Sequence, residues 1–207
     1  MPKSRRDHLT HAVIHSEAPV WTAFPTELGW IGIVGQQDRV AALTFGHSNP
    51  VQVRQHLVRK ADLPEDVREV EWCPKLQDQL TAYAAGERCD FASVPLHLDG
   101  LTPFRESIVN ALREVPYGHT VSYAELAALA GRPKAARAVG TAMASNRIPL
   151  IIPCHRVVAS GGNLGGFSAP NGLSMKQRLL QLEQVTSIKF DEELDASYLV
   201  EPRDVTS

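Results

Sequence analysis

The chain has 207 residues, of which 43% are hydrophobic and 21% charged, and its formal net charge is −2. This mixture is typical of a folded globular protein and excludes wholesale disorder and collagen-like structure. The longest apolar run, residues 148–154, is too short to span a membrane, and the first twenty residues show no secretory signal.

The first half of the chain begins with residues 1–20, which we expect to form a loose N-terminal arm. Leu28–Val34 and Val40–Phe45 are rich in β-prone residues, and the polar stretch 35–39 between them predicts a hairpin turn. Residues 91–98 predict another strand, which a proline within it weakens. The pattern indicates a small sheet.

Two helices are predicted between these strands. Residues 50–59 form the first. The second begins at Pro74, because proline suits a first helical turn, and ends before Gly86. Its apolar side chains recur at helical spacing, namely Leu76, Leu80 and Tyr83. Strands and helices together predict a small N-terminal α/β domain over residues 21–100.

The second half predicts mainly helices. Thr102-Pro103 is a typical helix start, with a capping residue before a proline. Residues 122–125 fit the capping-box pattern, and Gly131 separates that helix from a third one over residues 134–145. The last two form a helix-turn-helix candidate, with an ordinary helical hairpin as the alternative.

The third helix differs from a helix that reads bases. Its outer positions are small, and Arg137 is the one long side chain in the middle. Base readout uses groups of arginine, asparagine or glutamine. The pattern favours shape-dependent binding with a displaced base and Arg137 as a wedge, the alternative being a solvated surface arginine.

The most informative segment is Cys154-His155-Arg156, at the end of an apolar run. A thiolate is a strong nucleophile, and we expect the histidine and arginine to lower the pKa of the thiol. In a regular strand His155 would point away from Cys154, so a bridging water is a natural link between them. The alternative is a buried, inert thiol.

A glycine-rich loop over residues 160–172 follows, which suits close approach of the backbone to a ligand, although a flexible connection would look the same. A basic helix is predicted from Leu173 to Glu183. We therefore expect a mainly helical C-terminal domain over residues 101–184 and an acidic tail over residues 185–207.

The charges are unevenly distributed. Residues 101–183 carry nine Lys/Arg and four Asp/Glu, a net of +5, while the remainder has a net of −7. A local positive field attracts an anionic partner such as nucleic acid, although chance clustering on a solvated face gives the same pattern.

Five segments stand in an order and spacing that resemble the O6-alkylguanine-DNA alkyltransferases, also called methylated-DNA–protein-cysteine methyltransferases. They are Pro116-Tyr117-Gly118, Ser122-Tyr123, Arg137-Ala138-Val139-Gly140, Asn146 and Pro153-Cys154-His155-Arg156-Val157. The resemblance covers residues 101–183 strongly and residues 21–100 weakly. It implies a ribonuclease H-like N-terminal domain and a C-terminal alkyltransferase domain.

The resemblance also implies the reaction. Cys154 accepts the alkyl group of O6-alkylguanine, with O4-alkylthymine as a further candidate, in one turnover per molecule. His155 acts through a water on Cys154 and is held by Glu183, and Asn146 ties the recognition helix to the active-site turn. The family resemblance further implies contacts with DNA by Arg137, Tyr123, Ser122, Ala124, Arg132, Arg156 and Ser160, and a substrate pocket formed by Val157, Phe167, Ser168 and Met143.

The implied partner is double-stranded DNA, bound by a monomer without sequence preference, and neither a cofactor nor a membrane is expected. Cys73 and Cys89 lack a convincing metal-ligand set, so we expect no metal. Three cysteines without a CxxC pair indicate a reducing compartment, hence a cytoplasmic protein, or a nuclear one in a eukaryote. The competing functions are a lesion-binding protein of the alkyltransferase-like type and a cysteine hydrolase.

Overall fold

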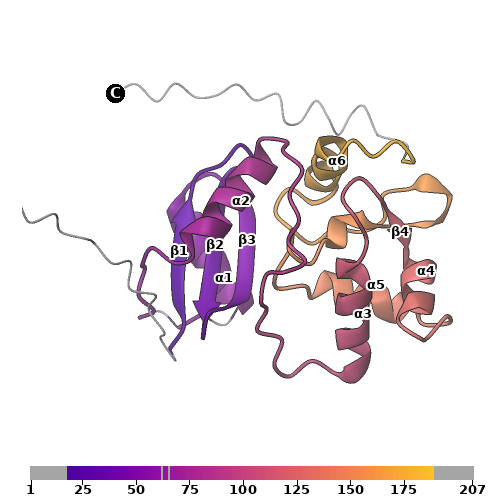
Figure 1. Ribbon diagram of the computed structural model, residues 1–207, viewed down its shortest axis with the longest axis horizontal. Coiled ribbons are helices and arrows are strands. Elements are labelled where there is room, and N and C mark those ends of the chain that lie inside the picture. Colours follow the sequence, from indigo (N-terminus) through magenta and orange to yellow (C-terminus); the bar gives the residue numbers. More distant parts are fainter. Residues whose placement is uncertain (1–17, 62, 65, 189–207) are drawn as a thin grey trace, which may run out of the picture.

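The computed structural model describes residues 18–61, 63, 64 and 66–188, which form two units side by side (Figure 1). The N-terminal unit has an antiparallel sheet of three strands in the order β1-β2-β3 and two helices. Its elements are β1 (Val20–Phe24), β2 (Trp30–Gln36), β3 (Arg39–His47), α1 (Pro50–Ala61) and α2 (Pro74–Ala84).

The predicted hairpin and both predicted helices of this unit are present. Gln37 and Asp38 form the turn between β2 and β3, both with a positive φ, as the tight turns of hairpins require. A Cβ atom on Gly32 would lie 2.1 Å from Val53, so this glycine lets α1 pack closely on β2.

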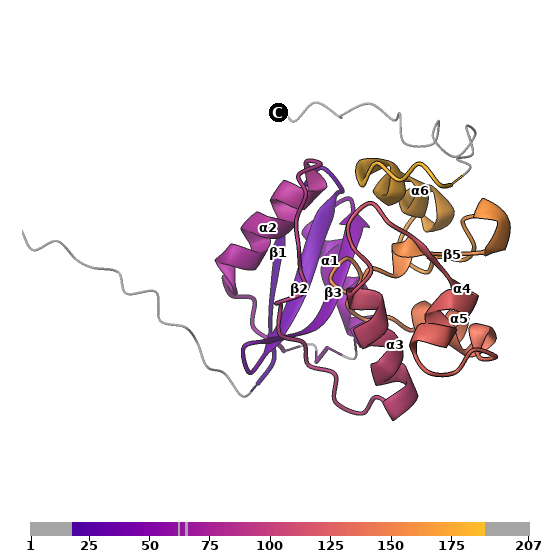
Figure 2. The same ribbon diagram turned by 45° about the vertical axis from the view of Figure 1, so that its right-hand side comes forward.

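The sheet has a different neighbour on each face. Val34 and Ala42 pack with Val53 and Leu57 of α1 in a small core of their own. The other face contributes its side chains to the main core, which also holds the apolar side of α2 and most of the C-terminal unit, among them Ile31, Ile33, Phe45, Leu80, Ile108 and Leu179. Because this core is continuous, the two units are packed against each other (Figure 2).

The C-terminal unit is mainly helical. Its elements are α3 (Pro103–Arg113), β4 (Val121–Ser122), α4 (Tyr123–Leu129), α5 (Ala136–Ala144), the 3-10 turn η1 (Cys154–Arg156), β5 (Val157–Val158), the 3-10 turn η2 (Ser160–Gly162) and α6 (Gly172–Leu182). β4 and β5 form a short parallel pair, which brings the segment after η1 beside the start of α4. The expected mixture of a small α/β unit and a mainly helical unit is confirmed.

The predicted helix starts are confirmed by their side-chain bonds. Thr102 accepts a hydrogen bond from the Arg105 amide. Ser122 and Glu125 form the reciprocal capping box, at 3.1 Å and 2.7 Å. These caps occupy backbone donors that a helix leaves unpaired at its first turn, so they fix where α3 and α4 begin.

One prediction about strands is wrong. Residues 91–98 form no strand. Their pairing with β3 is limited to one isolated bridge between Leu96 and Val40, and the carbonyls of Phe91 and Val94 accept from the side chain of Arg113. β1 begins at Val20, which is the last residue of the expected N-terminal arm. Residues 1–17 of that arm and residues 189–207 of the expected acidic tail lie outside the described residues.

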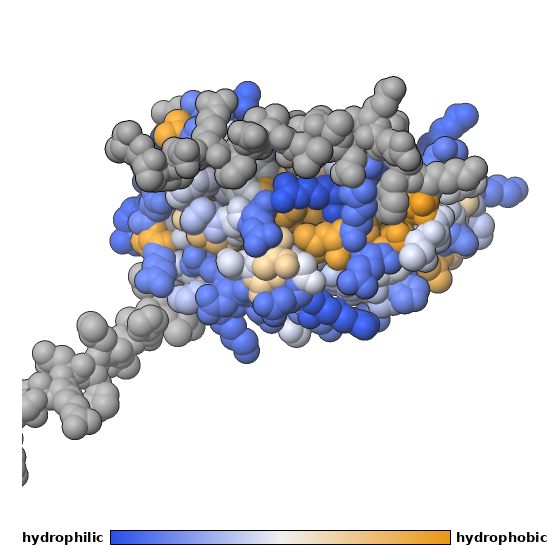
Figure 3. Space-filling model, turned by 90° about the horizontal axis from the view of Figure 1, so that it is seen from above, coloured by the Kyte–Doolittle hydropathy of each residue, from blue (hydrophilic) through white to orange (hydrophobic). Residues whose placement is uncertain are grey.

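No helix in the described part of the chain is both long and apolar enough to cross a membrane. Seen from above, hydrophobic residues are visible in several places among mainly hydrophilic ones (Figure 3). The large apolar side chains exposed among the described residues are Val51, Leu129 and Leu173.

Candidate active site

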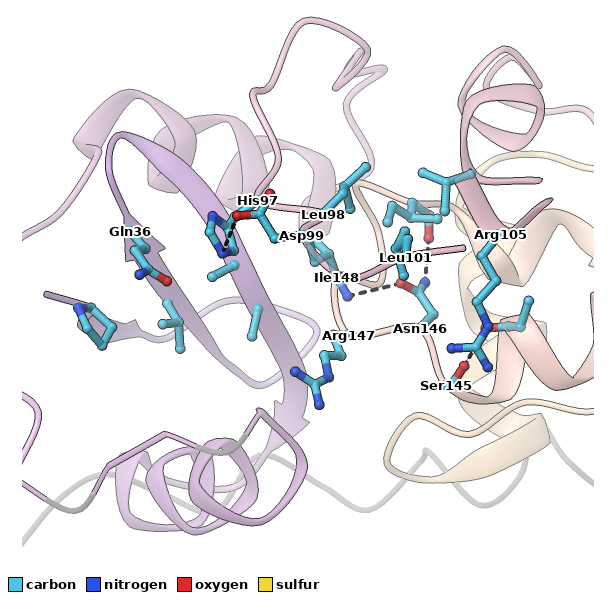
Figure 4. A pocket seen from close by; sticks show the side chains of 18 of the residues that line it. Gln36, His97, Leu98, Asp99, Leu101, Arg105, Ser145, Asn146, Arg147 and Ile148 are labelled. Carbon is cyan, nitrogen blue, oxygen red and sulfur yellow. Dashed lines mark hydrogen bonds and ion pairs between the residues drawn. The ribbon is translucent and has the colours of Figure 1, made fainter. Parts of the chain in front are cut away.

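Cys154 lies at the start of η1, directly after a buried segment that follows α5. Leu150 in that segment has a φ of 70°, an unusual conformation for a bulky side chain, and it is held there by burial in the core. Asn146 clamps the same segment, because its Nδ2 donates to the Ile152 carbonyl at 2.9 Å and its Oδ1 accepts from the Ile148 amide at 3.0 Å (Figure 4). Asn146 follows the end of α5, so these bonds link the helix to the segment that leads to Cys154.

A cavity of about 320 Å³ reaches Cys154. Asn146, Pro149 and Ser168 line it from the C-terminal unit. Thr44 and His56 line it from β3 and α1, so the N-terminal unit supplies part of the wall. A second cavity, of about 510 Å³, lies between the units on another side of Asn146 (Figure 4), and Cys154 is not among its lining residues.

Cys154 is only 6% exposed. Burial raises its pKa above the ordinary value, although a hydrogen bond involving Asn146 and the charge of Lys176 act in the opposite direction. The net pKa is therefore raised and not lowered as expected, and neither the ring of His155 nor the guanidinium of Arg156 is among the groups that lower it. A protonated thiol needs a base to become a nucleophile, and the adjacent His155 is the candidate base.

His155 is buried beside the carboxylate of Glu183, with 2.8 Å between His155 Nε2 and Glu183 Oε1. Arg156 donates to both carboxylate oxygens, from Nε at 2.9 Å and from its NH2 group at 3.0 Å. The amide of Gly118 adds a further donor at 3.2 Å. Burial opposes ionisation of Glu183, but the bonds from His155 and Arg156 outweigh it and hold the pKa of Glu183 well below its usual range.

This arrangement defines the tautomer of His155. An ionised carboxylate accepts hydrogen bonds only, so His155 Nε2 carries the proton that Glu183 receives. Burial lowers the pKa of His155, which keeps the ring neutral, and Nδ1 then carries the lone pair. His155 Nδ1 is buried and has no hydrogen-bond partner among the described residues, so it is available as a proton acceptor.

Arg156 was expected to contact DNA, and its position argues against that contact. Its guanidinium is buried and engaged by Glu183, and the remaining NH1 group donates to the Val115 carbonyl at 2.7 Å. The sequence shows that the charge of Arg156 lies near Cys154 along the chain, but it does not show that the guanidinium is buried.

Lys176 is a second buried charge, which the sequence analysis did not single out. Its Nζ donates to the carbonyls of Val157 at 2.6 Å, Leu164 at 2.5 Å and Gly166 at 3.2 Å. It therefore ties α6 to β5 and to the glycine-rich loop. Burial lowers the pKa of Lys176 to about 8. The sequence feature that could have indicated the burial of Lys176 is its position in the apolar stripe of α6, one residue after Met175.

The residues predicted to form a substrate pocket are only partly brought together. Ser168 lines the Cys154 cavity. Val157 is fully buried, Met143 borders the other cavity, and Phe167 is half-buried against the main core. Tyr123 lies under the loop, where a Cβ atom on Gly165 would come within 3.0 Å of its ring, and its hydroxyl is 3.5 Å from the Gly166 carbonyl.

The predicted helix-turn-helix consists of α4 and α5. Val139 and Met143 of α5 are buried, whereas Arg137 and the small residues Ala138, Thr141 and Ala144 are exposed, as predicted. Other residues with an expected role at DNA lie near this face or on the loop: Ala124, Arg132 and Ser160 are exposed, and Ser122 is engaged as the cap of α4. Arg132 also lies over the Phe104 ring, 4.7 Å from its centroid.

The described residues contain no group of three or more histidine, cysteine or acidic side chains arranged to hold a metal ion. All three cysteines are free.

Comparisons with known proteins give one consistent result. Residues 103–185 match the family described as "6-O-methylguanine DNA methyltransferase, DNA binding domain". A methylated-DNA–protein-cysteine methyltransferase of Methanosarcina acetivorans is 37% identical over 164 residues, which cover 79% of this chain and 97% of that protein. The constitutive enzyme of that name from Bacillus subtilis is 35% identical over 166 residues, covering 80% and 96%.

Solved structures agree with these sequence matches. The OGT protein of Mycobacterium tuberculosis in complex with DNA superposes with a TM-score of 0.65 at 32% identity, covering 80% of this chain and 93% of that one. The O6-methylguanine-DNA methyltransferase of Pyrococcus kodakaraensis gives a TM-score of 0.66 at 26% identity, covering 80% and 100%.

Proposed function

The chain belongs to the methylated-DNA–protein-cysteine methyltransferase family, and on that premise we propose that it repairs DNA by moving an alkyl group from guanine O6 to Cys154. The observation that carries the assignment to this residue is the cysteine beside a cavity, next to a neutral, buried histidine that a carboxylate orients. O4-alkylthymine is the further candidate substrate.

The reaction begins with a base outside the stack, because O6 of a paired guanine is out of reach in a duplex, and flipping it costs a few kcal/mol. His155 Nδ1 takes the thiol proton, through a bridging water. The sulfur attacks the alkyl carbon, a carbon–sulfur bond forms, and the carbon–oxygen bond breaks with its electron pair going to the guanine. The guanine anion takes up a proton at N1 from solvent and remains in the DNA as ordinary guanine, and His155 returns the thiol proton to solvent.

One molecule performs one transfer. The product is a thioether, in which carbon is bound to sulfur without an adjacent carbonyl, so water does not attack it as it attacks an acyl-enzyme. The protein is a reagent as well as a catalyst, with Cys154 consumed. Glu183 acts through His155, and Asn146 holds the segment that carries Cys154.

The exposed face of α5 is the proposed DNA surface. Small side chains at Ala138, Thr141 and Ala144 allow close approach to a backbone, and Arg137 is long enough to occupy the place of a displaced base. The small side chains carry no group that reads a base edge, and one arginine alone is not the group of arginine, asparagine or glutamine side chains that base readout uses, which supports binding without sequence preference. We also propose that the protein acts as a monomer. We place the protein in the cytoplasm, which its three free cysteines support.

Counting turnovers tests this function. The protein is incubated with an excess of duplex DNA that carries one labelled O6-methylguanine. We expect label to reach the protein and to stop at one methyl group per molecule. Label released to solvent, or repeated turnover on small esters, would favour a hydrolase; tight lesion binding without transfer would favour a lesion-binding protein.

The Arg137→Ala variant tests the role of Arg137 as a wedge separately from the transfer reaction at Cys154. We expect transfer from duplex DNA to slow by about 10-fold or more, because an unfilled stack favours return of the base, while reaction with free O6-methylguanine base stays unchanged. Rates are measured under single-turnover conditions with both substrates. Arg39→Ala is the matched control, since it removes one exposed arginine from the hairpin of the N-terminal unit. Equal losses on the two substrates would reject the wedge role.

A further inference from the structure

Tyr83 connects the N-terminal unit to the buried pair of His155 and Glu183. It lies on α2, 100 positions before Glu183, and it is only 1% exposed. Its hydroxyl donates to Glu183 Oε1 at 2.7 Å and lies 3.4 Å from His155 Nε2. A side chain from outside the C-terminal unit thus touches the carboxylate that orients the proposed base.

The hydroxyl is held in place and remains protonated. Its ring packs edge-on against Phe91 and Tyr117, with centroids 5.7 Å and 6.3 Å away. Burial, followed by the negative charge of Glu183, raises the pKa of Tyr83 well above its ordinary value. The phenol therefore stays protonated and acts as a fixed donor.

Three donors converge on one oxygen of Glu183. Oε1 receives Tyr83, His155 and the NH2 group of Arg156, whereas Oε2 receives Arg156 Nε and the Gly118 amide. Donors that share the charge of a carboxylate make it a weaker base. Glu183 can then accept the hydrogen bond from His155 Nε2 without favouring protonation of the imidazole to its charged form.

We propose that Tyr83 is a positioning residue for alkyl transfer: its hydroxyl fixes the Glu183 carboxylate so that His155 presents Nδ1 as the acceptor of the Cys154 proton. This inference rests on the proposed function and extends it, because it gives the N-terminal unit a part in the chemistry. α2 supplies this part through a single oxygen atom.

Tyr83→Phe tests the proposal, since it removes that oxygen and keeps the ring. We expect the single-turnover rate of methyl transfer at neutral pH to fall by about 10-fold. The acidic limb of the pH–rate profile moves to higher pH, because a less satisfied Glu183 favours the protonated imidazole. The other charged groups that act on His155 are Arg156 and Lys176, and they are the same in both proteins.

Tyr117→Phe is the matched control. It removes a hydroxyl from the same aromatic cluster, but that hydroxyl donates to the Leu182 carbonyl at 2.9 Å and not to Glu183. We expect some loss of thermal stability in both variants and a shift of the acidic limb in Tyr83→Phe alone. A purely structural role for Tyr83 would lower stability in both and leave both pH profiles in place, which would overturn the proposal.

A second readout does not depend on the reaction. The His155 ring is titrated by NMR in the wild-type protein and in both variants. A higher His155 pKa in Tyr83→Phe, with no change in Tyr117→Phe, supports the link; identical titration in all three proteins refutes it. If the wild-type protein transfers no methyl group, the proposed function fails, and this titration still decides whether Tyr83 acts on His155.

Discussion

Cys154→Ala is expected to abolish methyl transfer while leaving lesion binding intact. No other group can take the place of the sulfur, because the described residues put no second thiol at the cavity: Cys73 and Cys89 do not line it. The DNA surface on α5 is untouched by the change. Loss of one buried heavy atom costs about 1 kcal/mol of stability, so the variant still folds.

Two measurements check this expectation. Transfer is followed as label on the protein, and binding is followed by the affinity for duplex DNA with and without the lesion. Cys73→Ala and Cys89→Ala are the controls, and both should transfer at the wild-type rate. Residual transfer by Cys154→Ala, or loss of transfer in either control, would place the acceptor elsewhere.

Glu183→Gln is expected to be the most destabilising conservative change in the site. The carboxylate is fully buried and compensates the buried guanidinium of Arg156. An amide keeps the shape but leaves that charge without its partner, and breaking a buried ion pair in this way costs about 3–5 kcal/mol. Transfer should also slow by about 100-fold or more, the usual contribution of a well-placed general base, because His155 loses the group that fixes its tautomer.

The pH dependence of stability gives Glu183 a separate test. Its folded-state pKa lies below the value of about 4.3 for an unfolded glutamate. Its contribution is therefore complete above that value and is lost as the pH falls toward the folded-state pKa. Urea unfolding should show a large difference in the free energy of unfolding between wild type and Glu183→Gln at neutral pH. This difference should become smaller as the pH falls.

Glu106→Gln is the control for that comparison, because Glu106 is exposed in the first turn of α3 and should change stability by only a few tenths of a kcal/mol. The role given to Glu183 would be contradicted if the difference in unfolding free energy between wild type and Glu183→Gln stayed constant from neutral pH into acid, or if Glu183→Gln transferred at the wild-type rate.

Much of this fold could be predicted because its signals are local. The caps at Thr102 and Ser122 lie within four residues of the bonds they make, and the apolar spacing in α2 needs only one turn of context. The predicted place of Cys154 beside a base also depended on neighbouring residues. Such local patterns can be recognised without knowledge of the tertiary structure.

The missed features depend on distant partners. Tyr83 was predicted to be an apolar core residue, and nothing in α2 indicates a carboxylate 100 positions away. A DNA contact of Arg156 was expected from the family resemblance, and a sequence shows the charge of this residue but not its burial. Residues 91–98 have the composition of a strand, yet the β3 edge near them is bridged only at Val40.

The most direct test of the account is to find the atom that receives the methyl group. The wild-type protein reacts with duplex DNA that carries isotope-labelled O6-methylguanine, is digested, and its peptides are identified by mass spectrometry. The account predicts one labelled methyl group per molecule on the sulfur of Cys154, with unmodified guanine left in the DNA. Label on another peptide, or restored guanine with an unmodified Cys154, would contradict it.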